Sequence, residues 1–296
     1  MRLMSMEDCL ESLTAPQSTT SRRSLIRRAA ASWYYQLCIL FSYKMHLALE
    51  VMDVVLSALI YYFVSFMVSS EDLVSMGYTP DYLAFSISGI ALSRYIWTSV
   101  SRLAHKMHHE ISAGTFESLA AVDVDNFRGW LLGQVLYGFT WSSMWFVGAL
   151  LVGYALGAGF MHDPVLWMQA ALIVLLVVAV HSGIGIMAAG MYILHKQLEP
   201  LLVMFSVVIE FFGGVVYPLA LLRGYPVLYA IAILIPFTHG MELFRQTIIC
   251  GRPLCEHAML IHLGVLIAFL PIVYVGLRVF EHYLNVAKRR GLLSAY

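Results

Sequence analysis

The sequence predicts an all-helical integral membrane protein with six transmembrane helices, and three observations carry this prediction. Hydrophobic residues make up 60% of the 296 residues and charged residues only 12%, whereas ordinary soluble domains carry about 25% charged residues. A soluble fold of this length cannot bury so much apolar surface in one core, so lipid must solvate the excess. The apolar residues also gather in long stretches. The formal net charge of zero gives no reason to expect a nucleic-acid partner.

The N-terminal part divides into a polar tail and an amphipathic segment. Residues 1–21 are mixed and polar, and we expect them to form a disordered cytoplasmic tail. A single membrane domain, 22–296, follows. It opens with Arg22, Arg23 and Arg27, which lead into aromatic and apolar residues, a pattern typical of a helix lying in the inner headgroup layer. The double arginine also resembles a twin-arginine export signal, but no small-residue cleavage site follows it.

Six apolar stretches are long enough to cross about 30 Å of hydrocarbon, which needs roughly 20 helical residues. They lie near 45–68, 82–103, 129–157, 165–194, 197–217 and 258–281. A seventh apolar run, 225–235, is too short to span, and prolines bound it. Because short, proline-broken helices at membrane depth must be covered by protein, we expect extracellular re-entrant helices between spans five and six.

The basic residues predict the orientation. They gather at the N-terminus, after the second span, after the fourth span and at the C-terminus, whereas the first and third loops carry none and the fifth loop carries Arg223, Arg245 and Arg252. By the positive-inside rule both termini of this multi-pass plasma-membrane protein lie in the cytoplasm. The residues that set this asymmetry are Arg22, Arg23, Arg27, Arg28, Lys44, Arg102, Lys106, Arg128, Lys196, Lys288, Arg289 and Arg290.

Two cysteines lie in the predicted extracellular loop between spans five and six. Cys250 and Cys255 flank Gly251 and Pro253, which favour a turn. In an oxidising setting a disulfide between them would persist. Spacing alone does not set the geometry of the two side chains, so a bridge and two reduced thiols are both open.

The longest polar break between spans lies on the cytoplasmic side. A short helix that starts after Gly114 would be well capped, since Thr115 stands near its N-terminus and Glu117 in its first turn. Phe116 and Leu119 lie three residues apart, with Ala120 next to them, and form one apolar face. This pattern fits a docking element for a partner and fits an ordinary solvated loop equally well.

Four motifs resemble those of type-two ABC exporter permeases, the drug-, polysaccharide- and lipid-exporting branch of the ATP-binding-cassette transporters. The stretch 110–119 reads EISAGTFESL and is similar to their "E…GT-E-L" signature after the second span. The stretch 212–218, FGGVVYP, resembles the end of their fifth span, and 234–245, LIPFTHGMELFR, resembles the segment before their sixth. The tail 287–296, AKRRGLLSAY, is similar to the C-termini of many members. The resemblance covers about 22–296.

This resemblance implies a transport subunit without catalytic residues. The segment near 110–122 would be the coupling helix, seated in a groove of a separate ATPase. The complex would hold two ATPase subunits and a second, identical permease copy in the bilayer. ATP and Mg would bind to the ATPases, and this chain would hold no cofactor; it also contains no Gly-x-x-x-x-Gly-Lys-[Ser/Thr] motif. The implied coupling residues are Glu110, Gly114, Thr115, Phe116, Glu117 and Leu119.

Charged residues inside spans are candidates for function, because a charge at membrane depth needs a reason and a partner. Asp53 and Arg94 lie at similar distances from the cytoplasmic ends of spans one and two, with Glu50 one turn from Asp53. We therefore predict an ion pair between Arg94 and Asp53 or Glu50. The pair either pins two helices together or gates substrate.

Glu210 lies one turn before Gly213 in the fifth span and is a candidate for the exit path. The plainer interpretation is a structural pair with Arg223, His239 or Arg245. His181 is expected to be a packed, hydrogen-bonded histidine. The rival function is a proton- or ion-coupled secondary carrier that uses Asp53 and Glu210.

The sequence predicts no metal site. His105, His108 and His109 lie close together, with His105 and His109 one helical turn apart, but no cysteine or carboxylate of obvious geometry accompanies them.

Overall fold

The computed structural model describes residues 22–121, 124–195 and 197–290, and in these ranges it contains helices and no strands. The expected tail 1–21, Lys196 and the last six residues of the C-terminal motif, 291–296, lie outside the described residues. The elements in chain order are α2 (Arg22–Ser42), α3 (Lys44–Ser65), α4 (Ser70–Ser75), α5 (Tyr82–Trp97), the π-helical η1 (Thr98–Arg102), α6 (Leu103–Ser112), α7 (Phe116–Ala121), α8 (Val124–Ala155), α9 (Pro164–Tyr192), α10 (Glu199–Phe212), the 3-10 helix η2 (Leu219–Gly224), α11 (Pro226–Leu234), α12 (Pro236–Ile248), α13 (His257–Ala268) and α14 (Ile272–Arg290).

Four helical segments of the described chain are long and apolar enough to cross a membrane. They are α3, the part of α8 from Phe127 to Ala155, α9, and the 34 residues His257–Arg290 that α13 and α14 form together. The helices α11 and α12 meet at a bend of 86° and would count as a fifth span only if taken as one broken helix. The protein is therefore an all-helical protein with several candidate membrane spans.

Two of the stretches expected to span are shorter or differently built than the sequence predicts. The helix α10 has 14 residues and ends at Phe212, because Gly213 and Gly214 follow and Gly214 adopts φ +63°, a left-handed conformation that favours glycine. The helix α5 has 16 residues but continues without a break through η1 into α6. The result is one helical rod, residues 82–112, which we call the α5–α6 rod.

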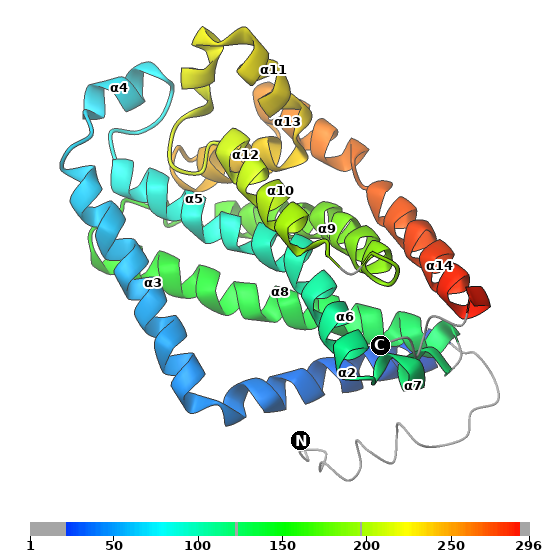
Figure 1. Ribbon diagram of the computed structural model, residues 1–296. Coiled ribbons are helices and arrows are strands. Elements are labelled where there is room, and N and C mark those ends of the chain that lie inside the picture. Colours follow the sequence, from blue (N-terminus) through cyan, green and yellow to red (C-terminus); the bar gives the residue numbers. More distant parts are fainter. Residues whose placement is uncertain (1–21, 122–123, 196, 291–296) are drawn as a thin grey trace.

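Local sequence explains where several of these helices begin. Asp81 caps α5, since its Oδ1 accepts a hydrogen bond from the backbone N–H of Ala84 at 2.9 Å. Asp163 caps α9 in the same way through Val165 N–H at 2.8 Å, and Pro164 takes the first helical position. Both caps lie at the end of the molecule that carries α4 and α11 (Figure 1).

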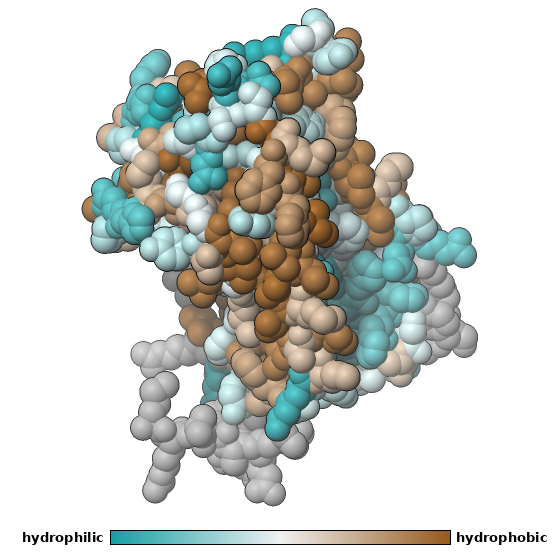
Figure 2. All heavy atoms as spheres, turned by 90° about the vertical axis from the view of Figure 1, so that its left-hand side faces the viewer, coloured by the Kyte–Doolittle hydropathy of each residue, from teal (hydrophilic) through white to brown (hydrophobic). Residues whose placement is uncertain are grey.

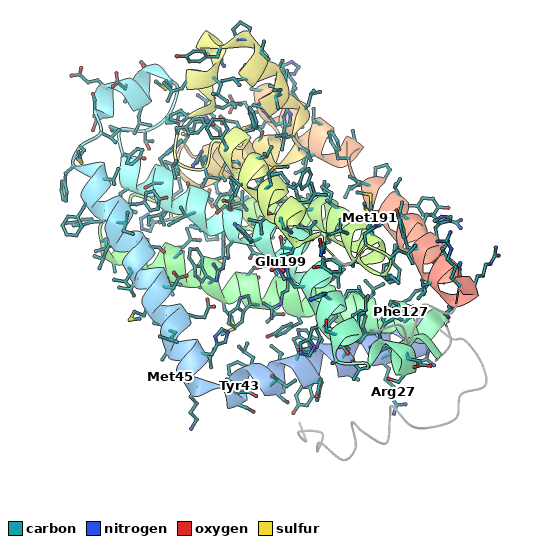
Figure 3. The ribbon with its side chains drawn as sticks, viewed as in Figure 1. Arg27, Tyr43, Met45, Phe127, Met191 and Glu199 are labelled. Carbon is teal, nitrogen blue, oxygen red and sulfur yellow. The ribbon has the colours of Figure 1, made fainter. Side chains whose placement is uncertain are left out.

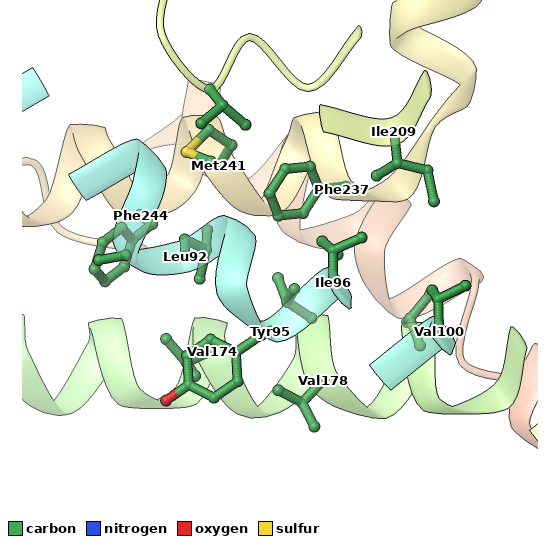
Figure 4. Close-up of a cluster of buried hydrophobic side chains, with 14 of the residues drawn as sticks. Leu92, Tyr95, Ile96, Val100, Val174, Val178, Ile209, Phe237, Met241 and Phe244 are labelled. Carbon is green, nitrogen blue, oxygen red and sulfur yellow. The ribbon is translucent and has the colours of Figure 1, made fainter. Parts of the chain in front are cut away.

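The elements form a bundle with α5, α8 and α9 at its centre. Figure 1 shows α2 crossing the base beneath α8, with α6, α7 and the end of α14 at the same end, and α4 and α11 at the opposite end. The core gathers between α5, α9 and α12, where Ile96, Val178 and Phe237 come together (Figure 4). In the most apolar 18 residues of α9, 61% of the residues are buried inside the protein, whereas in those of α3 only 11% are buried.

Close approach of α9 and α14 depends on small residues. A Cβ on Gly276 would collide with the backbone carbonyl of Gly183, and a Cβ on Gly190 would lie 2.6 Å from the Cα of Phe280. Glycine therefore allows the two backbones to touch, as expected for helices packed in lipid, where van der Waals contact replaces the hydrophobic driving force.

The helix α3 leaves most of its side chains on the outside. Figure 2, which turns the α3 side of Figure 1 toward the viewer, shows apolar side chains running down the middle of this face, with hydrophilic ones at the upper end and in a patch at the right. Val51, Ile60 and Phe63 are each 60% exposed or more. At the elbow between α2 and α3, Tyr43 and Met45 point outward (Figure 3). A lipid environment accounts for such a face, since large exposed apolar patches are rare on soluble monomers.

Candidate functional site

The ion pair expected in the membrane is formed in the structure. Arg94 Nη2 lies 3.0 Å from Glu50 Oε2 and Arg94 Nη1 lies 3.9 Å from Asp53 Oδ2, so the first carboxylate is the principal partner. The guanidinium also lies over the ring of Trp145, 5.1 Å from its centre. Trp145 Nε1 donates a hydrogen bond to Asp53 Oδ2 at 3.2 Å.

This arrangement links three helices, because Glu50 and Asp53 belong to α3, Arg94 to α5 and Trp145 to α8. The side chain of Arg94 is 30% exposed and that of Glu50 23%, so the pair is partly desolvated. At this degree of burial, removing one partner costs more than the intact pair contributes, since the other charge is left without compensation. A structural role in pinning α3 to the bundle therefore follows directly from the contacts.

Glu210 lies in α10 and faces α5. Its carboxylate interacts with the side chains of Ser93 and Trp97. Among the described residues no salt bridge joins Glu210 to Arg223, His239 or Arg245, the partners weighed from the sequence. The carboxylate is thus held by neutral donors of the neighbouring helix.

His181 is buried in α9. Its Nδ1 forms a hydrogen bond with the carbonyl of Val177 at 2.7 Å, and its ring meets that of Phe237 edge-on at 5.8 Å. Because a carbonyl oxygen only accepts, Nδ1 carries the proton, and Nε2 has no hydrogen-bond partner within the described part of the chain. The packing is that of a structural histidine.

The segment proposed from the sequence as a coupling element consists of α6, a turn and α7. The backbone N–H of Thr115 donates to the carbonyl of Glu110 at 3.0 Å, and its hydroxyl donates to both the carbonyl and the carboxylate of the same residue. Gly114 stands between them at φ +71°, where residues with a side chain are strained. Lys106 Nζ lies 2.7 Å from Glu110 Oε1. The turn is therefore fastened to the end of the α5–α6 rod.

The electrostatics of Glu110 reflect these contacts. Partial burial raises the pKa of this carboxyl, but hydrogen bonds from Lys106 and Thr115, with the charge of Lys106, outweigh it and hold the pKa below its ordinary value. Glu110 thus acts as the anionic end of a local network.

The expected apolar docking face of α7 is turned inward in part. Phe116 is 2% exposed and meets the ring of Phe127 of α8 edge-on at 6.2 Å, and Leu119 is half-buried. Among residues 116–119, the part of this helix whose exposure the structure describes, the exposed side chains are Glu117 and Ser118. The sequence pattern correctly identified an apolar face, but the chain itself covers Phe116, because α8 returns directly beside α7.

His105 belongs to a contact between α6 and the first residue of α10. Its Nε2 lies 2.9 Å from Oε1 of Glu199 (Figure 3), the first residue of α10. Its Nδ1 forms a hydrogen bond with the carbonyl of Ser101. The described ranges contain no group of three or more histidine, cysteine or acidic residues arranged to hold a metal ion.

The sequence suggested Arg245 of α12 only as one of three possible partners of Glu210, and its contacts in the structure are with other residues. The side chain is 1% exposed. It donates hydrogen bonds to the carbonyls of Gly214 at 2.7 Å, Phe85 at 3.1 Å and Val215, and its guanidinium lies 3.6 Å from the centre of the Phe85 ring. Arg245 therefore ties α12 to α5 and to the chain just after α10.

A second contact of α12 lies beside it. The hydroxyl of Tyr78, in the loop before α5, donates to Glu242 Oε2, and Gln246 Nε2 donates to Glu242 Oε1 at 2.9 Å. Burial and the neighbouring carboxylate raise the pKa of Tyr78. The sequence pattern that could have indicated these contacts is the Glu-x-x-Arg spacing of Glu242 and Arg245, since it places both side chains on the same side of α12.

Cys250 and Cys255 are free thiols in the structure. Of the two possibilities that the sequence leaves open, the structure has the reduced one. Cys250 is half-buried, with its Sγ 3.9 Å from the carbonyl of Gly77, whereas Cys255 is exposed. The two side chains thus occupy different environments on either side of the turn.

Comparison of the chain with protein-family models finds no match, and a search of curated proteins finds no significant match. The assignment of a function to this chain therefore rests on its motifs and its geometry.

Proposed function

We propose that the chain is the permease subunit of an ATP-driven ABC exporter, located in the cell membrane with both termini in the cytoplasm. Its six spans are α3, the α5–α6 rod, α8, α9, α10 with the turn after it, and α13 with α14. The helix α2 lies in the inner headgroup layer, and α11 with α12 forms the extracellular re-entrant pair. The polypeptide has no nucleotide-binding loop of its own, so energy comes from two separate ATPase subunits.

The observation that carries the proposal is the fastening of α7 to the α5–α6 rod. Thr115 donates three hydrogen bonds to Glu110 and so holds the turn across Gly114, and Phe116 anchors α7 against α8. A displacement applied to α7 is therefore transmitted along a rigid helix into the membrane, which is what coupling to a moving partner requires. The exposed face of α7, with Glu117 and Ser118, is the part that a partner contacts.

The other end of the same rod carries a second rigid connection. Arg245 holds α12 to the carbonyl of Phe85, near the start of α5, and to the chain after α10. Motion of the rod thus reaches the extracellular side without a flexible link. The exposed apolar faces of α3 and α10 lie against lipid and against a second, identical copy, between which the substrate passes.

The test is co-purification of the full-length chain, with an affinity tag, from native membranes in mild detergent. We expect an ATPase to accompany the wild-type protein and to show ATP hydrolysis in the eluted complex. A parallel sample carries Gly114→Ala, Thr115→Ala and Glu117→Ala, and here we expect the ATPase to be lost or its hydrolysis to become independent of the permease.

A matched control carries Glu71→Ala and Asp72→Ala in α4, which changes exposed acidic residues at the opposite end of the bundle and should leave the complex intact. Absence of any ATPase from the wild-type sample, together with transport driven by a pH gradient alone, would overturn the proposal. It would favour the secondary-carrier interpretation, with Asp53 and Glu210 as the residues to replace.

A further inference from the structure

Two cavities meet beside the Arg94–Glu50 ion pair. The first is polar and open, has a volume of about 370 Å³, and is lined by residues that include His46, Arg94, Arg102 and His105. This volume falls within the range of about 300–1,000 Å³ that small-molecule sites occupy. We call it the polar cavity.

The second cavity is an apolar groove between α3 and α8 with a volume of about 160 Å³. Its walls come from two helices only, with Val51 and Val54 on one side and Met144 and Gly148 on the other. Both cavities share Glu50 and Trp141, so the groove continues the polar cavity. A ligand that fills both must have a polar end and a slender apolar part.

The charges of the polar cavity favour an acidic group. Arg94 has its partner in Glu50, whereas Arg102 has no carboxylate within ion-pair distance in the part of the chain that the structure describes. Its guanidinium instead lies over the rings of Tyr137, at 4.5 Å, and Trp141, at 5.4 Å. These aromatic contacts and a side-chain hydrogen bond to Tyr137 hold the guanidinium in place, and its remaining hydrogen-bond donors can bind a ligand. With histidines neutral, the two arginines and Glu50 give the lining one net positive charge.

The position of the site along the helices matches one leaflet of a membrane. Arg102 stands at the end of the predicted second span, and Arg94 is eight residues deeper, about 12 Å along a helix. The groove begins at Leu47, one turn into α3, and runs inward to Val152. In the orientation of the proposed function, the polar cavity lies at the level of the cytoplasmic headgroups and the groove at the level of the acyl chains.

We propose that these two cavities form a binding site for an anionic amphiphile of the cytoplasmic leaflet. Its acidic headgroup lies against Arg102 and Arg94, and one alkyl chain lies between α3 and α8 against Trp141 and Trp145. Basic pockets between membrane helices on the cytoplasmic side bind anionic headgroups for the same electrostatic reason. The assignment to this leaflet rests on the proposed function, whereas the pairing of headgroup and chain rests on the cavities alone.

The test uses Trp141 and Trp145 as reporters, since bromine atoms on an acyl chain quench tryptophan fluorescence on contact. The full chain is placed in nanodiscs of phosphatidylcholine that contain a small fraction of either brominated phosphatidylglycerol or brominated phosphatidylcholine. We expect stronger quenching by the anionic lipid in the wild-type protein. The variant with Trp141→Phe and Trp145→Phe should lose this difference, because the remaining four of the six tryptophans lie outside the groove.

Two further variants separate the headgroup from the chain. Arg102→Gln should weaken phosphatidylglycerol binding about tenfold, the equivalent of one charge-assisted hydrogen bond, without leaving a carboxylate unpaired. Gly148→Leu should fill the groove and abolish the excess quenching. Arg278→Gln and Gly264→Leu are the matched controls, since the first side chain is exposed on α14 and the second position faces open space.

Equal quenching by the two lipids, or unchanged selectivity in an Arg102→Gln protein that elutes as a folded species in size-exclusion chromatography, would overturn the site. The measurement needs no ATPase, so it fails separately from the proposed function. Lipid-selective quenching without any co-purifying ATPase would support the lipid site and contradict the exporter proposal. A co-purifying ATPase without lipid-selective quenching would support the exporter proposal and contradict the lipid site.

Discussion

Arg245 shows how a full charge is accommodated inside this protein. A guanidinium out of water is costly unless its donors are satisfied, and here backbone carbonyls satisfy them. Gly214 and Val215 offer theirs because α10 has ended at Phe212, so these oxygens have no helical partner. The arginine therefore closes a helix end and is stabilised by that end in return.

Replacement of Arg245 by lysine should destabilise the protein by about 2–4 kcal/mol, because one ammonium cannot reach three carbonyls and each hydrogen bond to a charged group contributes about 1.5–3 kcal/mol. Thermal unfolding in detergent measures the change. Arg223→Lys, at an exposed position of η2, is the control and should leave the melting temperature unchanged. Equal melting temperatures for the two variants would contradict this account of Arg245.

Gly89 gives a second prediction in the same region. A Cβ at this position would collide with the carbonyl of Val215 and with Nη2 of Arg245. Since a backbone oxygen cannot move aside cheaply, Gly89→Ala should cost about 1–3 kcal/mol. Gly264→Ala, on a helix position with nothing within 4 Å, should be neutral or stabilising by up to about 1 kcal/mol. The same unfolding measurement distinguishes them, and a neutral Gly89→Ala would show that α5 and the turn after α10 are not in contact.

Glu110 predicts a pH dependence. Its folded-state pKa lies below the ordinary value of 4.5, so its contribution to stability is complete above pH 4.5 and is lost as the pH falls through the lower, folded-state pKa. Thr115→Val removes one of the hydrogen bonds that lower the pKa and should raise it, which moves the loss to higher pH. Melting temperatures recorded from neutral pH downward test this, and an identical acid profile for Glu110→Gln and wild type would refute it.

The sequence predicted the contacts of those residues whose partners lie at the same depth along neighbouring helices. Arg94 and Glu50 were paired because a charge in a span needs a countercharge at the same level. The partners of Arg245 could not be found in this way. They are backbone carbonyls from two distant segments, and they become available only through the tertiary contact of α12 with the end of α10.

The sequence composition predicted that helices form in these stretches, but it predicted their first and last residues less well. The fifth stretch was expected to continue to residue 217, because Val215, Val216 and Tyr217 are apolar, but Gly214 turns the backbone out of the helix before them. The second stretch was expected to end at residue 103, whereas helix continues to Ser112 through residues that are mostly polar. Hydropathy reports where lipid can be, and a helix that leaves the lipid continues without an apolar signal.

The helix α7 illustrates the same limit for faces. The spacing of Phe116 and Leu119 identifies an apolar side, but it contains no information on what covers that side. Phe127 covers it, since the chain turns back into α8 within a few residues. Replacement of Phe116 by alanine should therefore loosen α7 by about 3–5 kcal/mol of packing and cavity energy, and hydrogen exchange of residues 115–119 should rise sharply. Glu117→Ala, which changes an exposed side chain, should leave the exchange rates as they are.

For the molecule as a whole, the membrane class followed from composition, and the arrangement of helices did not. The sequence contains nothing that assigns α2 to the underside of α8, where Gly133 lets the backbone of α8 approach Ser32. Such helix pairs form only where the surfaces of both helices fit together at several glycines at the same time. In the described ranges four helical segments qualify as spans by length and composition, or five if α11 and α12 count as one bent span, because α5 and α10 are each too short to qualify alone.

The proposed orientation predicts which cysteine reacts from outside the cell. A membrane-impermeant maleimide added to intact cells should modify Cys255, which is exposed, faster than Cys250, where burial raises the pKa of the thiol and lowers the fraction of thiolate. Mass spectrometry of the labelled peptide gives both rates. Cys255→Ser should remove the rapid phase, and labelling of Cys255 only after permeabilisation would reverse the orientation.

The π-helical segment Thr98–Arg102 sets the angular phase between the two halves of the α5–α6 rod. A turn with i→i+5 hydrogen bonds holds one residue more than an α-helical turn, and it leaves the carbonyl of Ser99 directed at the bare Cα of Gly185. Loss of one residue here would let the rod run as an uninterrupted α-helix whose far end faces almost the same way, because the wide turn takes up its extra residue within one turn. A deletion of one residue is therefore absorbed at this segment, whereas the same deletion elsewhere in α5 or α6 would turn α7 by about 100° toward another side of the molecule.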